Sequence, residues 1–168
     1  SGDYLCFLNA GDRFPNADVL EKIVKNTGIG DSQAPAKVLP AVLYGETDII
    51  DENGKFLRHR RLSAPERLSW QSFKDGMLVC HQAFYVRTDI SRLIRYNTKY
   101  RFSADVDLCI LVMKEAERLG LPIANAHAVL ANYVQEGQTT EHHRESLKER
   151  YHVMTVHYGH WSTLAMHV

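Results

Sequence analysis

An uninterrupted apolar run near the start of the chain, Tyr-Leu-Cys-Phe-Leu at residues 4–8, constrains the fold most strongly. The run is too short for a helix, and the absence of polar alternation is typical of a strand buried on both faces. Strands of this kind occur mainly in parallel sheets that helices cover on both sides. We therefore expect an α/β fold in which residues 4–8 form a parallel strand.

Other segments supply the helices and strands that such a fold needs. Asn16 is a good helix N-cap before apolar residues at helical spacing, and the Asn53-Gly54 pair predicts a tight hairpin between two strands. The helical stripe is Val19, Leu20, Ile23 and Val24. Further expected elements are short helices within residues 64–73 and 88–94 and strands within residues 77–86 and 123–134.

The longest predicted helix starts after Ser103, which can serve as its N-cap, and ends at Gly120 and Pro122. The tail from Glu141 onward predicts a charged helix with one apolar face, which we expect to dock on the protein because its charges are mixed. The apolar stripe of the long helix is Val106, Cys109, Ile110, Met113 and Ala116.

Length, charge and cysteine content limit the class of protein to which the chain can belong. The chain has 168 residues and no internal repeat, which suits a single domain over residues 1–168. A formal net charge of zero argues against nucleic-acid partners, which need a basic surface. No apolar run approaches the ~20 residues of a membrane span. The three cysteines form no CxxC pair, so we expect buried thiols and a reducing, cytoplasmic location.

Asp12 follows the first predicted strand in the segment Asn9-Ala10-Gly11-Asp12. Ligands of open α/β sheets bind beyond the carboxyl ends of the strands, and a carboxylate there suits Mg²⁺ or Mn²⁺. Gly11 allows the backbone to approach a ligand closely. The alternative is that Asp12 only caps a turn, and spacing alone favours that role.

Asp105 lies in the first turn of the long helix, where the helix dipole favours a carboxylate. Asp107 points to nearly the opposite side, so we expect one acid to face a cleft and the other to be solvated. The alternative role for both is helix stabilisation, worth roughly 0.3–1 kcal/mol.

His81 and Gln82 are polar residues inside a predicted apolar strand, where burial is costly without hydrogen bonds. His81 suits a proton shuttle, a substrate contact or a bonded core histidine, and general frequency favours the last. The basic run at residues 58–61 is expected to be a solvated strand end. The C-terminal histidines, expected on a solvated helix face without zinc, are His142, His143, His152, His157 and His160.

Four segments together resemble family 2 glycosyltransferases of the GT-A fold, especially bacterial enzymes of surface-polysaccharide synthesis. They are "GDYLCFLNAGDRF", "VLYGETDIID", "GMLVCHQAFYVR" and "YRFSADVDLCILV", in the order found in that family, and the resemblance runs from Gly2 to about residue 140. It implies a mixed α/β sheet flanked by helices. It also implies inverting transfer of a sugar from a nucleotide-diphosphate sugar to an acceptor hydroxyl.

The resemblance also implies roles for particular residues. Asp12 matches the metal site, although Asn9 and Gly11 replace the family's other acids, and a divalent cation, Mg²⁺ or Mn²⁺, is the implied cofactor. Asp105 matches the catalytic base, although Ala104 replaces the acid that often precedes it. Substrate-binding positions are implied for Asn9, Gly11, Glu46, His81 and Gln82, and residues 136–140 resemble a glycine-bearing stretch after the last core strand.

In this family a nucleotide-binding half precedes the "GDYL" strand, so the chain resembles a C-terminal portion, truncated at its N-terminus, and we expect it to be a poor or inactive catalyst alone. The implied acceptor is a glycan or lipid-linked sugar. Two further possibilities remain: that the protein contacts the inner face of the membrane peripherally, and that it self-associates through an exposed edge of the sheet. Two rival functions remain: a non-catalytic, degenerate binding domain and a metal-dependent phosphohydrolase.

Overall fold

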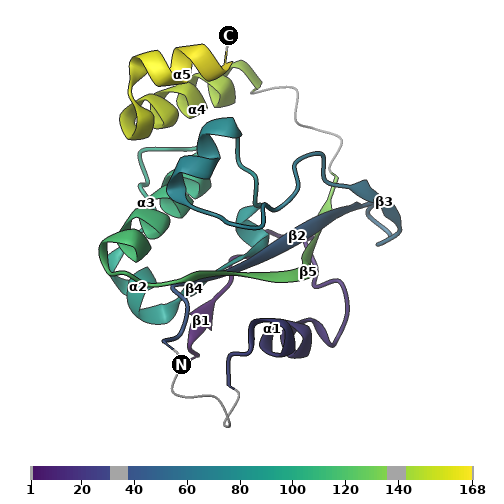
Figure 1. Ribbon diagram of the computed structural model, residues 1–168. Helices are drawn as coiled ribbons and strands as arrows, with labels where there is room; N and C mark the ends of the chain where they lie inside the picture. Colours follow the sequence, from purple (N-terminus) through teal and green to yellow (C-terminus); the bar gives the residue numbers. More distant parts are fainter. Residues whose placement is uncertain (1, 31–37, 136–142, 168) are drawn as a thin grey trace.

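A mixed five-stranded sheet forms the centre of the computed structural model, which describes residues 2–30, 38–135 and 143–167. Helix α1 lies on one side of the sheet and α3 on the other, and α4 and α5 form an outer layer over α3 (Figure 1). The strands are β1 (Tyr4–Leu5), β2 (Val42–Ile50), β3 (Phe56–His59), β4 (Phe84–Arg87) and β5 (Ile123–Val134). The helices are α1 (Val19–Thr27), α2 (Thr88–Leu93), α3 (Ala104–Arg118), α4 (His143–Tyr158) and α5 (His160–His167), with 3₁₀ helices η1 (Trp70–Asp75) and η2 (His81–Ala83).

Strand β2 organises the sheet. It pairs in parallel with β5 along its whole length and antiparallel with β4 near Val42 and with β3 near Ile50. Since β5 takes one edge of β2, β4 and β3 share the other edge at its two ends. β1 pairs antiparallel with β4, so β1, β2 and β5 all run in one direction and their carboxyl ends lie at the same edge of the sheet. An α/β fold with a mixed sheet is therefore confirmed.

The first strand differs from its prediction. β1 covers only two residues, and Leu5 and Leu8 expose 39% and 38% of their surface, so the run is not buried on both faces. Its hydrogen-bonded neighbour is the antiparallel strand β4, although β1 does run parallel to β2 and β5. Within the described residues no strand pairs with its second edge. An edge strand needs apolar side chains only where the sheet covers it, which explains the partial burial.

The predictions made from local sequence patterns are confirmed for the β2–β3 hairpin and for the apolar stripe of α3. Gly54 adopts a φ of +84° in the turn, and the Asp51 side chain accepts a hydrogen bond of 2.8 Å from the Lys55 amide. α1 begins at Val19 after Asp18, so the prediction of Asn16 as its N-cap was wrong. The whole predicted stripe of α3 is buried, namely Val106, Cys109, Ile110, Met113 and Ala116.

The strand predicted for residues 77–86 was wrong over most of its length, since β4 begins only at Phe84 and residues 81–83 form η2. Arg60 explains part of the difference, because its guanidinium donates hydrogen bonds to the carbonyls of Met77 and Leu78. Those carbonyls are therefore not available to a neighbouring strand. Arg60 itself is half-buried rather than part of a solvated strand end.

Candidate functional site

Asp12 connects three segments at the carboxyl edge of the sheet. Its Oδ2 accepts a hydrogen bond of 2.7 Å from Gln82 Nε2, and its Oδ1 accepts one of 3.1 Å from the Val134 amide at the end of β5. Its own amide donates to the Asn9 carbonyl at 3.1 Å, and Gly11 permits this tight turn with a φ of +93°. The carboxylate thus fixes the loop after β1 against η2 and β5.

Asp105, in the first turn of α3, contacts η2 through His81. Its Oδ2 lies 3.2 Å from His81 Nδ1, and the side chains of His81 and Asp105 expose 15% and 26% of their surface. Because His81 and Gln82 are adjacent in the chain, they bring Asp105 and Asp12 to one site. Burial raises the pKa of the nearby Cys80 thiol, and the negative charges of Asp105 and Asp12 both add to this increase.

Asp105 is held in its ionised form. Burial acts to raise its pKa, but the hydrogen bond and positive charge of His81, the Val106 amide and the charge of Arg150 outweigh burial and lower the pKa below its ordinary value. A carboxylate with a lowered pKa is charged at neutral pH. It can therefore accept a hydrogen bond or a proton from a bound hydroxyl without first losing a proton of its own.

Two other predicted substrate-binding residues lie outside this hydrogen-bonded set. Glu46, on β2, accepts a hydrogen bond of 3.0 Å from the Ala64 amide. Asn9 is exposed, and within the described part of the chain only its carbonyl makes a hydrogen bond, to Asp12. The structure therefore connects Asp12 with Asp105 through the adjacent residues Gln82 and His81, and Glu46 and Asn9 take no part in this connection. The segment 136–140 lies outside the described residues.

Asp107 is not solvated, contrary to the sequence-based expectation. It is 5% exposed, and its Oδ1 lies 2.6 Å from Nε2 of His157 in α4. His157 Nδ1 lies 3.1 Å from Lys114 Nζ, which can only donate, so Nε2 carries the proton that bonds Asp107. The His157 side chain is 4% exposed, so the prediction of a solvated position was wrong for it. His152 and His160 are exposed as predicted, and His142 lies outside the described residues.

Glu149, on α4, holds the start of the helix that carries Asp105. Its carboxylate accepts hydrogen bonds from the amides of Arg101, Phe102 and Ser103 at 2.9, 2.6 and 2.7 Å. Ser103 is the N-cap residue of α3 as predicted, and its carbonyl accepts a hydrogen bond of 3.1 Å from the Asp107 amide, but its hydroxyl makes no hydrogen bond to a described residue. A carboxylate at a helix N-terminus also interacts favourably with the helix dipole. No local pattern predicts this role, because the residues that Glu149 binds are far away along the chain.

Glu149→Gln should lower the free energy of unfolding by about 1 kcal/mol at pH 7, the usual cost of losing a helix cap. Burial raises the pKa of Glu149, but the three amide hydrogen bonds outweigh it and lower the pKa. The contribution is therefore complete above the unfolded pKa of about 4.3 and is lost as the pH falls through the folded pKa. Urea unfolding should show a larger difference between the variant and the wild type at pH 7 than at pH 3. Glu21→Gln on exposed α1 is the control, and an equal loss in both variants would contradict the role.

A divalent cation at this site would be coordinated by one carboxylate of the described residues, that of Asp12. Among the residues that the structure describes, no group of three or more His, Cys, Asp or Glu side chains is arranged to hold a metal. Each Asp12 oxygen accepts one hydrogen bond and has a second lone pair. Such a carboxylate suits Mg²⁺, which commonly takes one or two carboxylates and completes its shell with water and substrate phosphates.

Comparisons with known proteins do not assign the chain to a family. No protein family model matches the sequence, and a search of curated proteins finds no significant match. Within the described ranges, none of the helices combines the length and apolar character needed to cross a bilayer. The interpretation of the site therefore depends on its geometry.

Proposed function

We propose that this chain belongs to an inverting glycosyltransferase that moves a sugar from a nucleotide-diphosphate sugar to an acceptor hydroxyl. One observation carries the proposal: Asp12 and Asp105, far apart in the sequence, bind the adjacent residues Gln82 and His81. Gln82 and His81 therefore connect a carboxylate at the carboxyl edge of the sheet with a second, ionised carboxylate at the start of α3. The resemblance of the surrounding segments to family 2 glycosyltransferases supports the same assignment.

Each residue has a role in this reaction. Asp105 accepts the proton of the acceptor hydroxyl while that oxygen attacks the anomeric carbon, and His81 orients the Asp105 carboxylate through their hydrogen bond. The bond from the anomeric carbon to the diphosphate breaks, and the nucleoside diphosphate leaves with the electron pair. A single displacement of this kind inverts the anomeric configuration. Asp12 would hold a divalent cation, which supplies charge stabilisation to the departing phosphate.

The proposal is tested by a transfer assay on the protein as its gene encodes it. The protein is incubated with Mg²⁺, a panel of nucleotide-diphosphate sugars and glycan or lipid-linked acceptors, and products are identified by mass spectrometry and NMR. We expect a glycoside of inverted configuration and one nucleoside diphosphate per transfer. Release of free sugar at the same rate with and without acceptor would favour a phosphohydrolase. Nucleotide-sugar binding without turnover would favour a non-catalytic domain.

A further inference from the structure

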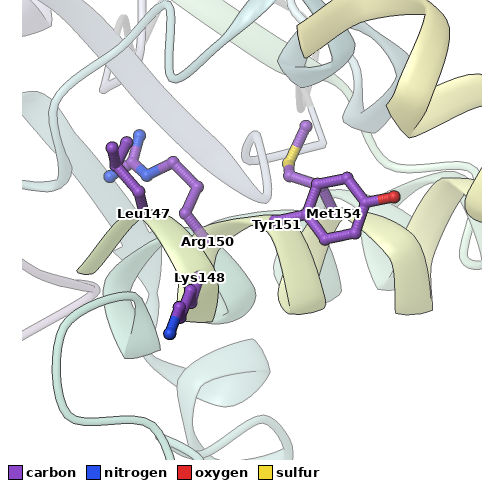
Figure 2. A pocket seen from close by; sticks show the side chains of 5 residues that line it. All are labelled: Leu147, Lys148, Arg150, Tyr151 and Met154. Atoms are coloured by element: carbon purple, nitrogen blue, oxygen red, sulfur yellow. The ribbon is translucent and has the colours of Figure 1, made fainter. Parts of the chain in front are cut away.

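A cavity on α4 lies outside the hydrogen-bonded site described above. Its volume is about 440 Å³, and its lining combines apolar, aromatic and basic side chains (Figure 2). Leu147 and Arg150 project together from one side of α4, and Lys148 projects from the other (Figure 2). The lining residues are Leu147, Lys148, Arg150, Tyr151 and Met154.

Arg150 is the chemically informative residue of this lining. It is partly buried, and with the residues that the structure describes its guanidinium makes no hydrogen bond or ion pair. A guanidinium carries five N–H donors arranged to bind a carboxylate or phosphate through two bonds at once. Partial burial without such a partner is unfavourable, so the position suits a bound anion.

The cavity lies next to the candidate base. Glu149, the residue before Arg150, binds the amides of residues 101–103 immediately before α3, and Asp105 follows in the first turn of that helix. The positive charge of Arg150 also contributes to the lowered pKa of Asp105. Arg150 is therefore near enough to Asp105 for its charge to act on that carboxylate.

We propose that Arg150 and the α4 cavity bind an anionic group, a phosphate or a carboxylate, on the acceptor sugar. This inference rests on the proposed function and specifies its acceptor as a negatively charged one. Leu147, Tyr151 and Met154 would contact the carbon skeleton of the acceptor, while Arg150 fixes its charge. The anion would also offset the positive charge near Asp105. This offset would raise the pKa of Asp105 and make it a stronger proton acceptor.

The test measures binding and needs no turnover. The chain is titrated at pH 7 with glucose 1-phosphate, glucuronate and neutral glucose, while NMR follows the Arg150 Nε–H and Met154 methyl signals. We expect at least one anionic sugar to bind 10-fold or more tightly than glucose and to shift both signals. Arg150→Gln should weaken that binding about 10-fold, equivalent to about 1.4 kcal/mol. Arg144→Gln, on the exposed side of the same helix, should leave it unchanged.

The two anionic probes distinguish the possible sources of charge. Tighter binding of glucose 1-phosphate alone would indicate a phosphorylated acceptor, whereas equal binding of glucuronate would indicate any acidic sugar. Anionic sugars that bind no more tightly than glucose, or that lose affinity equally in both arginine variants, would overturn the inference. Anion binding with no transfer in the assay above would overturn the proposed function but leave the anion site in place.

Discussion

Asp105→Asn is expected to lower the rate of sugar transfer by about 10²–10⁴-fold, the usual contribution of a positioned base. Asparagine has nearly the same size and retains an oxygen for the hydrogen bond with His81, so the geometry of the site should persist. It cannot accept the proton of the acceptor hydroxyl, and attack on the anomeric carbon then requires a much poorer base. Initial rates at saturating donor and acceptor, compared with the wild type, measure the effect.

The matched control for this experiment is Asp18→Asn. Asp18 is an exposed acid that forms an ion pair with Lys22 before α1, away from the site, so its replacement should leave the transfer rate within about twofold. Thermal unfolding of both variants confirms that they are folded. If Asp105→Asn transfers sugar as fast as Asp18→Asn, then Asp105 is not the base and the proposed mechanism is wrong.

Asp107→Ala is expected to lower the free energy of unfolding by about 2 kcal/mol, the cost of leaving the donor of a buried hydrogen bond without its charged acceptor. The substitution leaves the Nε2 proton of His157 without its acceptor in a site where both side chains are nearly inaccessible to water. It also removes the negative charge near Lys114, which lies 3.1 Å from the other ring nitrogen. Urea unfolding at pH 7, followed by circular dichroism, provides the measurement.

Two further variants interpret that loss. Replacing Asp107 and His157 together with leucine should recover most of the stability, since both polar partners are then replaced by apolar groups. Asp89→Asn, which breaks the pair of the exposed Asp89 with the partly buried Arg87, should cost less than about 1 kcal/mol. A cost for Asp107→Ala as small as that for Asp89→Asn would mean that the His157 contact does not stabilise the docking of α4 on α3.

The elements predicted best are those that depend on local pattern alone. β5 spans the predicted residues 123–134, and the predicted apolar stripe of α3 is buried. These predictions are reliable because the spacing of apolar residues and the turn residues act on neighbours only a few positions away in the chain. The wrong predictions concern segments whose backbone binds a residue far away in the sequence. Arg60 binds the backbone near Met77 and shortens the predicted strand, and Glu149, rather than the Ser103 hydroxyl, binds the backbone amides before α3.

The sequence alone determined that the chain forms an α/β fold and which face of α3 is buried, since hydrophobic periodicity records burial. Only the tertiary structure decided which polar groups meet: Asp12 with Gln82, His81 with Asp105, and Asp107 with His157. A hydrogen bond depends on placement to within a fraction of an ångström, which follows from sheet register and helix packing. That placement leaves no periodic signal along the chain, so these contacts become visible only when the elements are assembled.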